Sequence, residues 1–220
     1  MKNSIIFCAL FIISFSAKTQ TREISGVVYA FNKFPLKNVN VSAKKSKMQV
    51  VTDDNGRFII NVKKNDNLTI EATAFDRYTC HIKEKDTNLR INLIYENNER
   101  YKEIAIDEGI ISREDLEYGL EHLASDNNIY YNFTDVFDAI HYALPAANFI
   151  VENGTKKVML RGPKTVAGSN AALFVVDGVI VDDISYVAPS EIVDIKQLSS
   201  SQAAIYGARG GGGVVVITTK

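Results

Sequence analysis

The chain has few of the residues that cross-link exported domains or bind metal ions. Its 220 residues include two cysteines and three histidines. Cys8 lies in an N-terminal apolar run, so Cys80 alone would remain after processing, and one cysteine cannot form an intramolecular disulfide. His81, His122 and His141 form no H-E-x-x-H motif and have no other ligands at metal spacing. We therefore predict surface or capping roles for the histidines and no metal site.

Motifs for catalysis and nucleotide binding are also missing. There is no G-x-S-x-G motif, and the adjacent carboxylates Asp182 and Asp183 would point to opposite faces of a strand. The glycines of residues 206–213 lack the Lys-Ser/Thr of a phosphate loop, and a helix precedes them where a dinucleotide site needs a strand. Asp53 to Gly56 does not start a calcium loop, because position 12 is Lys64. We predict no enzymatic activity, no catalytic residues and no cofactor.

Charge divides the chain into regions. The formal net charge of −1 gives no general case for nucleic-acid binding. Residues 21–95 contain 13 Lys+Arg and 8 Asp+Glu, residues 96–126 contain 3 and 10, and residues 127–220 contain 7 and 8. The acidic block separates two different regions, and we interpret residues 96–132 as an acidic, solvated linker with a helix.

Residues 1–19 have the pattern of a secretory signal peptide. Lys2 supplies the positive charge, and Ile5 to Phe15 is apolar apart from Ser14. This run is too short for a permanent transmembrane helix. No later stretch reaches 18 apolar residues, so the sequence predicts an exported protein without a transmembrane helix after cleavage.

Residues 21–95 consist of short segments in which apolar and polar side chains alternate. Phe58, Ile60 and Val62 repeat with a period of two, as expected for a strand with one buried face. The run Asp53-Asp54-Asn55-Gly56 marks a turn. Short alternating strands with regular turns predict an all-β sandwich.

Helix signals occur in the linker and directly after it. Ser112 is followed by acidic residues and then by leucines at helical spacing, which predicts a helix start. A second helix is expected from Thr134, with Pro145 at its end.

A hairpin and a buried strand are expected in the last 48 residues. Asp177-Gly178 tolerates the positive φ values of a type I′ turn, which would pair Val176 with Val179, Val175 with Ile180 and Phe174 with Val181. Six β-branched residues at 214–219 indicate a strand that is buried on both faces.

Short helices are expected between the hairpin and that strand. Ser190 is a candidate cap for a helix near Glu191, and Ser199 to Tyr206 has the composition of another short helix. Gly207 is expected to end that helix in the left-handed conformation.

Two family resemblances follow from these motifs. Through ISGVV, PLKNVNV and TDDNGRF, which includes Gly56, residues 21–95 resemble the carboxypeptidase-regulatory-like domain, a non-catalytic Ig- or transthyretin-like sandwich. Residues 133–220 resemble the plug domain of TonB-dependent outer-membrane receptors of the SusC-like, Bacteroidetes type. The motifs that carry this second resemblance are, in order, Arg161-Gly162, the Asp177-Gly178 hairpin, PSEIVDIKQL, AIYGARG with Tyr206, Gly207 and Arg209, and the terminal GGVVVITTK with Gly213.

The second resemblance implies an α+β plug-like domain with a small mixed sheet and short helices. It assigns structural roles to the motif residues: Gly178 and Gly207 adopt special backbone conformations, and Arg161 or Arg209 pairs with buried carboxylates. In this family the plug fills a 22-stranded barrel, and no residues follow Lys220 that could form one. We therefore expect a periplasmic protein that associates with the outer membrane through a separate barrel or an envelope complex.

Three points stay open at this level. The only candidate for the TonB-coupling segment, Glu103 to Ile106, resembles the family pattern loosely, so TonB coupling is doubtful. One alternative is an N-terminal fragment of a complete receptor. Another is a free periplasmic module that binds a peptide or glycan, for which Tyr130, Tyr131 and Phe133 are the only dense aromatic group.

Overall fold

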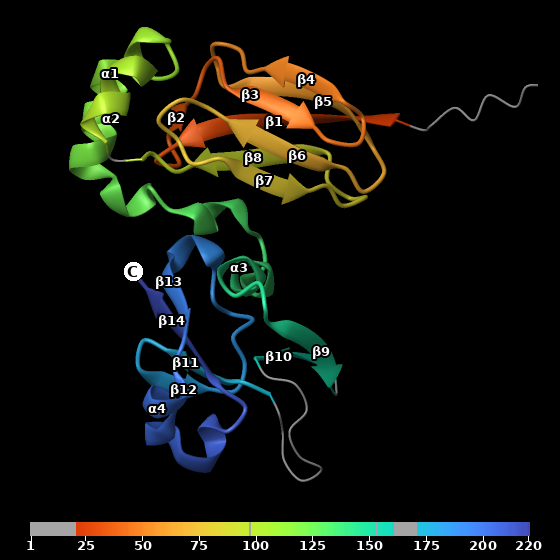
Figure 1. Cartoon of the computed structure of the whole chain (residues 1–220), viewed down its shortest axis with the longest axis vertical. Coiled ribbons are helices and arrows are strands. Elements are labelled where there is room, and N and C mark those ends of the chain that lie inside the picture. The colour runs from red at the N-terminus through yellow and green to blue at the C-terminus, as the bar shows by residue number, and fades with distance from the viewer. Residues whose placement is uncertain (1–20, 97, 153, 161–170) are drawn as a thin grey trace, which may run out of the picture.

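The computed structural model describes residues 21–96, 98–152, 154–160 and 171–220, and it contains two domains along its long axis (Figure 1). The N-terminal domain is a β-sandwich, and the C-terminal domain combines a mixed sheet with short helices. The signal-peptide prediction for residues 1–19 lies outside the described residues.

Two four-stranded sheets form the sandwich. In the first, β1 (Thr21–Ala30) pairs antiparallel with β2 (Phe34–Pro35) and β5 (Arg57–Lys63) and parallel with β8 (Asn88–Leu93). The second has the antiparallel order β4 (Met48–Val51), β3 (Asn40–Ala43), β6 (Asn67–Glu71), β7 (Tyr78–His81). The alternation predicted for β5 is confirmed, since Phe58, Ile60 and Val62 are buried and their neighbours Ile59 and Asn61 are exposed.

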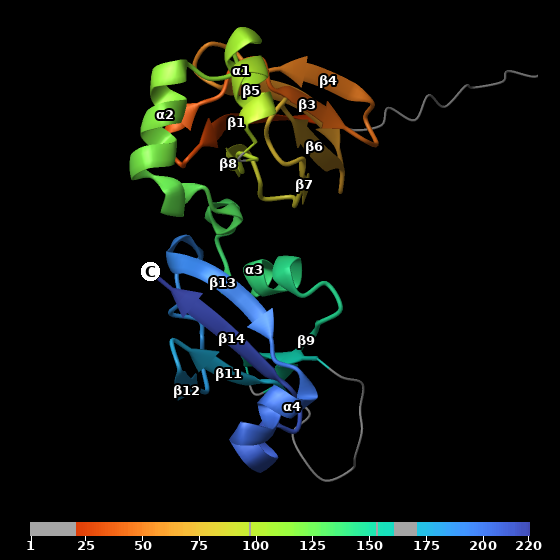
Figure 2. The ribbon, with the colours of Figure 1, turned by 60° about the vertical axis from the view of Figure 1, so that its left-hand side comes forward.

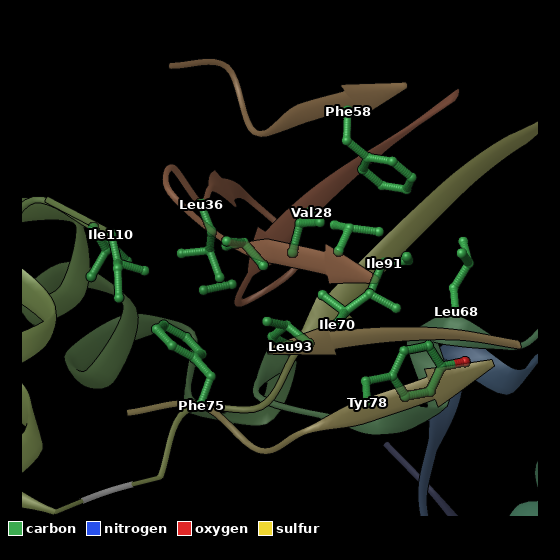
Figure 3. Close-up of a cluster of buried hydrophobic side chains, with 14 of the residues drawn as sticks. Val28, Leu36, Phe58, Leu68, Ile70, Phe75, Tyr78, Ile91, Leu93 and Ile110 are labelled. Atoms are coloured by element: carbon green, nitrogen blue, oxygen red, sulfur yellow. The ribbon is translucent and has the colours of Figure 1, made fainter. Parts of the chain in front are cut away.

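The first core lies between these sheets, where Val28, Phe58, Leu68 and Ile91 meet (Figure 3). It also extends past the last strand, because Ala105, Ile110, Ile111 and Leu116 are buried in the same cluster. The acidic segment therefore packs against the sandwich instead of being solvated throughout. It contains two helices, α1 (Glu99–Asp107) and α2 (Arg113–His122), where the sequence predicted one.

Both helices begin with a capping side chain, although the sequence predicted only α2. Ser112 caps α2 by accepting a hydrogen bond from the Asp115 N–H at 3.1 Å, as expected. In α1, Asn98 performs the same role toward the Arg100 N–H at 3.0 Å. In α1, three apolar residues, Ile104 to Ile106, are consecutive, so the sequence showed no helical spacing there.

The C-terminal domain centres on a sheet with the order β12, β11, β14, β13 (Figure 2). These strands are β11 (Leu173–Val176), β12 (Val179–Val181), β13 (Ile192–Gln197) and β14 (Val214–Thr219). β11 and β14 are parallel, and the other pairs are antiparallel. Helix α3 (Val136–Ala143) packs on this sheet, and a separate hairpin joins β9 (Asn148–Glu152) to β10 (Thr155–Met159).

The β-branched run of β14 behaves as predicted. Val215 and Ile217 belong to the core that includes α3, while Val214 is buried with Leu173 and Ala203 in a separate cluster. Both faces are thus covered over most of the strand, and only Thr218 is exposed within it.

Short helical turns complete this domain: 3-10 turns η1 (Ala124–Asp126), η2 (Ile129–Asn132), η3 (Pro189–Glu191) and η4 (Ala204–Gly210), and helix α4 (Ser200–Ala203). Ser199 caps α4 in a reciprocal capping box with Gln202. The prediction for Ser190 was wrong. Pro189 starts the turn one residue earlier, Ser190 lies inside it, and Ile192 already enters β13. The start of α3 is also shifted, because the helix begins at Val136 instead of Thr134 and is capped by Asp135.

Candidate functional site

The Asp177-Gly178 turn forms as predicted. Its residues have φ values of 49° and 84°, and the flanking strands pair in the expected register. Asp177 also does something the motif does not show: its carboxylate accepts hydrogen bonds from the Thr219 N–H at 2.8 Å and from the Thr219 hydroxyl at 2.6 Å. These bonds hold the pKa of Asp177 below its ordinary value and fasten the hairpin to the end of β14.

The glycine-rich segment before β14 makes a compact double turn. Gly207 has φ 57° and ψ −140°, a combination that only glycine adopts readily, but this ψ is not the left-handed helical value that was expected. The chain therefore kinks at Gly207 and continues as a 3-10 turn to Gly210. Tyr206 packs against the cluster of Val214 and Ala203. Gly213 has φ 100°, and a Cβ there would lie 2.8 Å from Leu160 Cδ1.

The motif arginines give one correction. Arg209 lies 3.7 Å from Asp182, whose side chain is 92% exposed, so this partner is not the buried carboxylate that was expected. An exposed pair of this kind contributes little stability. Arg161 and Gly162 lie outside the described residues. Gly56 adopts φ 70° in the first domain, where a Cβ would meet the Val28 carbonyl oxygen at 2.6 Å.

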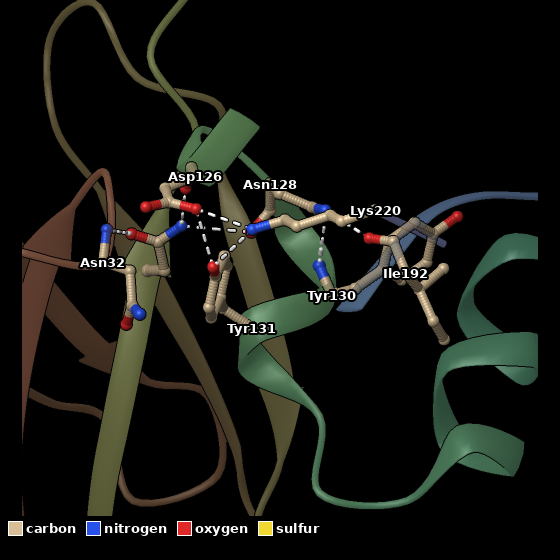
Figure 4. A network of polar contacts seen from close by, with 8 residues as sticks. Asn32, Asp126, Asn128, Tyr130, Tyr131, Ile192 and Lys220 are labelled. Atoms are coloured by element: carbon tan, nitrogen blue, oxygen red, sulfur yellow. Dashed lines mark hydrogen bonds and ion pairs between the residues drawn. The ribbon is translucent and has the colours of Figure 1, made fainter. Parts of the chain in front are cut away.

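A polar junction between the two domains was missed by the sequence reasoning. Figure 4 shows that Lys220, at the end of β14, reaches the segment that leaves the sandwich. Its Nζ donates to Asp126 Oδ1 at 2.7 Å and to Tyr131 Oη at 2.8 Å, and Tyr131 Oη donates to the same Asp126 oxygen at 2.7 Å. Burial acts to raise the pKa of Asp126, but the bonds from Lys220 and Tyr131 outweigh it and lower that pKa.

The centre of the junction is Asn92 on β8, a polar residue that is only 2% exposed. Its side-chain oxygen accepts from the Asn32 N–H at 2.7 Å, and its Nδ2 donates to the carbonyls of Asp126 and Asn128, each at 3.1 Å. The backbone of Asn92 is bound in both directions by the amide of Asn132. All of the polar groups of this buried side chain are therefore used, as a buried amide requires.

Two further asparagines extend the junction to both domains. Asn127 exchanges hydrogen bonds with the backbone of Tyr95, at 2.8 and 3.0 Å. Asn128 donates from its side chain to the carbonyl of Ile192 on β13. The D-N-N-I-Y-Y-N segment, residues 126–132, is thus hydrogen-bonded to the sandwich on one side and to the C-terminal sheet on the other. Its density of asparagines was the signal that could have revealed this role.

The aromatic group of the same segment does not form an exposed platform. Tyr130 is buried in the core that includes α3, and the Tyr131 hydroxyl is hydrogen-bonded to Asp126 and Lys220. Phe133 packs with its ring centroid 5.3 Å from that of Tyr142. The feature that would have favoured a free peptide- or glycan-binding module is therefore not formed by these residues.

Other candidate groups have local partners. His81 bonds to Asn67 at 2.8 Å, while His122 and His141 pack against Tyr118 and Phe149. Within the described ranges, no three His, Cys, Asp or Glu side chains are grouped to hold a metal ion. Burial raises the pKa of the Cys80 thiol to about 12, which makes it a poor nucleophile.

The segment considered for TonB coupling is part of α1. Glu103 to Ile106 is helical, and Ala105 is fully buried against the sandwich. Residues in this state are not free to pair with another chain as a strand. Across the part of the chain that is described, no helix combines the length and the hydropathy that a membrane span needs.

A cleft of about 680 Å³ opens beside the start of α3. Two charged groups at its wall bond to each other, since Lys156 Nζ donates to Asp135 Oδ2 at 2.8 Å, and Asp135 also caps the Phe137 N–H. Tyr186 and Asp183 also line the cleft. This arrangement offers a polar surface, in which the Ser185 hydroxyl donates to Asp183 Oδ2 at 2.7 Å within a single turn.

Comparisons with known proteins identify the first domain and the chain's relatives. Residues 24–106 match the CarboxypepD_reg-like domain, a range that ends within α1. A TonB-dependent receptor of Formosa agariphila is 28% identical over 225 residues, covering 99% of this chain and 22% of the relative. SusC, a TonB-dependent receptor of Bacteroides thetaiotaomicron, is 24% identical and covers 94% of this chain and 22% of the relative. A second Formosa agariphila TonB-dependent receptor is 25% identical, over 90% and 20%.

The chain thus spans about a fifth of the length of these relatives. Among solved structures, a catechol 1,2-dioxygenase from Acinetobacter is 10% identical and covers 45% of this chain and 50% of its own, but its TM-score of 0.27 is too low to support an inference. Residues 24–106 thus match the CarboxypepD_reg-like domain, and the chain is similar over nearly its whole length to TonB-dependent receptors, SusC among them.

Proposed function

We propose that this protein serves TonB-dependent nutrient uptake at the outer membrane without being an enzyme, and that residues 133–220 act as a plug-like domain within a β-barrel. The observation that carries the proposal is the extent of the similarity to receptors. The alignment with one receptor covers 99% of this chain, so it includes the hairpin, the glycine-rich turn and β14 as well as the sandwich.

The junction supports a role in which the two domains act together. Asp126, Asn92 and Asn128 connect the sandwich to β13 and β14 through direct hydrogen bonds. A movement of the plug-like sheet would therefore be transmitted to the sandwich and not lost in a loose linker. Because Glu103 to Ile106 is helical and partly buried, we do not assign contact with TonB to that segment.

The proposal is tested by crosslinking in the native host. A photoreactive residue replaces Ile205, which is 80% exposed on the C-terminal domain, and the matched control places it at Ile59, which is 59% exposed on β5 of the sandwich. Envelopes are fractionated, and the mass of every species that carries this sequence is determined.

A barrel protein crosslinked from Ile205 but not from Ile59 would support a plug-like domain with a separate barrel. The same contact within one much larger polypeptide would support the plug role with the barrel on the same chain. A species of the mature mass in the soluble periplasm, with no barrel contact from either position, would refute the proposal and favour an independent binding module.

A further inference from the structure

Three turns at one end of the sandwich carry an unusual number of lysines. They are the β3–β4 turn with Lys44, Lys45 and Lys47, the β5–β6 turn with Lys63 and Lys64, and the β7–β8 turn with Lys83 and Lys85. The turns lie together, since Lys44 N–H bonds to the Asn67 carbonyl and Ile82 N–H to the Asp66 carbonyl. We call this region the lysine end; β1 also begins there (Figure 1).

Charge is concentrated at the lysine end. With Arg22 it contains eight cationic residues and three acidic ones, Asp66, Glu84 and Asp86, and Lys83 is paired with Asp138 of α3 at 2.8 Å, which leaves a formal charge of +4. The other five cationic and five acidic residues of segment 21–95 cancel. The whole positive charge of the sandwich therefore sits at one end of the domain.

A buried carboxylate holds the lysine turns in place. Asp66, with no exposed surface, accepts backbone N–H bonds from Lys45 at 2.6 Å, Ser46 at 2.9 Å and Lys63 at 3.3 Å. The backbone of two turns is thereby fixed, while the side chains of Lys44, Lys45 and Lys47 are exposed. Within the described residues, no ion pair engages these three lysines.

The chemistry of this end suits a diffuse negative surface better than a specific anion. Its free cations are lysines, which act as point charges, whereas paired phosphate recognition favours the fork of arginine. The one arginine is already used, because the Arg22 guanidinium donates to the carbonyls of Glu84 and Asp86. Met48, which follows Lys47 directly, is exposed and apolar, as a side chain at a headgroup boundary would be.

We propose that the lysine end of the sandwich binds an anionic phospholipid surface and so anchors the domain against a membrane leaflet. This inference rests on the proposed function, which places the protein at a membrane. Lysines near an anionic bilayer contribute about 1 kcal/mol each, or about a fivefold gain in affinity, and the attraction falls with salt.

The test uses the full mature chain and sedimentation with vesicles of phosphatidylcholine, with or without 30% phosphatidylglycerol as the probe lipid. The variant Lys44→Gln with Lys47→Gln should weaken binding to the anionic vesicles by about 25-fold. The matched control, Lys33→Gln with Lys37→Gln, removes the same charge outside the lysine end and should leave binding within about twofold. Melting curves check that both variants are folded.

Binding that requires phosphatidylglycerol, falls with salt and is lost selectively in the Lys44/Lys47 variant supports the proposal. Equal losses in both variants, or no binding, overturn it. So does salt-sensitive dimerisation or binding to a soluble polyanion at affinities above that for vesicles, because the surface would then serve a second copy or another macromolecule. The crosslinking from Ile205 to a barrel is independent of this outcome, so the two proposals fail separately.

Discussion

The packing of α2 on the sandwich can be tested with one methyl group. Gly119 lies in the interior of α2, and a Cβ placed there would come within 2.5, 2.7 and 2.9 Å of three ring atoms of Phe31. Phe31 is only 1% exposed and has a φ of 49°, so neither its ring nor its backbone has room to move freely. We predict that Gly119→Ala destabilises the protein, although alanine is the better helix former.

Two opposing effects set the magnitude. Replacing glycine with alanine inside a helix stabilises it by about 1 kcal/mol. Overpacking a filled core costs about 1–3 kcal/mol, and the three close approaches place this site in the upper part of that range. The net expectation is a loss of about 1–2 kcal/mol. For a chain of this size, that corresponds to a fall in melting temperature of about 2–8 °C.

The assay is urea denaturation and thermal melting followed by circular dichroism. The variant Phe31→Ala removes all three ring atoms that clash, so Gly119→Ala should become neutral or stabilising in that background, and the double-mutant cycle should show a favourable coupling of at least about 1 kcal/mol. If Gly119→Ala alone raised the melting temperature, α2 would not pack on Phe31, and the inclusion of the acidic segment in the first core would be wrong.

Three other predictions concern single residues. Asp66→Asn should lower the free energy of unfolding by on the order of 3 kcal/mol at pH 7, because it weakens several bonds to buried N–H groups. Since the folded pKa of Asp66 is lowered, this contribution to stability is present at neutral pH and is lost as the pH falls below the ordinary value of 3.8. A series of urea denaturations in which the variant's loss of stability persisted in acid would contradict the assignment. Gly178→Val should lower stability by about 1–2 kcal/mol through the positive φ alone, because no atom lies within 4 Å of a Cβ there. Gly178→Asn is the matched control and should show a smaller loss. Equal melting temperatures for the two variants and the unchanged protein would argue against the turn. Cys80 should react with a disulfide reagent about 10–100-fold more slowly in the folded protein than in urea at pH 8, because fewer thiolates form but each is more nucleophilic. Its stabilising effect is complete below pH 9 and is lost as the pH rises toward about 12, and a rapid reaction in the native state would show that the thiol is not sequestered.

The hairpin and the last strand were predictable because their signals are local. Asp177-Gly178 selects its turn through backbone sterics alone, and the turn then fixes the pairing of Val176 with Val179. The β-branched run of β14 is likewise a local signal, because a strand that is buried on both faces is apolar along its own sequence. In both elements, the residues from which the structure was predicted are the same residues that form it.

Local sequence was less informative where tertiary contacts decide. Three of the apolar residues of helix α1, Ile104 to Ile106, are consecutive and show no helical spacing, and Ala105 among them is fully buried against the sandwich. The prediction for Gly207 was partly wrong for a related reason. Positive φ was foreseeable for a glycine after a helix, but its ψ of −140° reflects the need to bring the chain back to β14 beside β11.

The junction between the domains also depends on tertiary contacts that the local sequence does not indicate. An asparagine-rich segment next to an acidic block has the composition of a linker, because asparagine favours turns when its amide bonds to its own backbone. Here the amide of Asn132 bonds to Asn92 on β8 and that of Asn127 bonds to Tyr95, just after β8. Lys220, 94 positions from Asp126, supplies the contact from the C-terminal sheet. No local pattern encodes a pairing over that separation. A segment interpreted as part of a solvated linker therefore connects the sandwich to the C-terminal sheet through direct hydrogen bonds. Under the proposed function, a movement of that sheet would act on the sandwich at this segment.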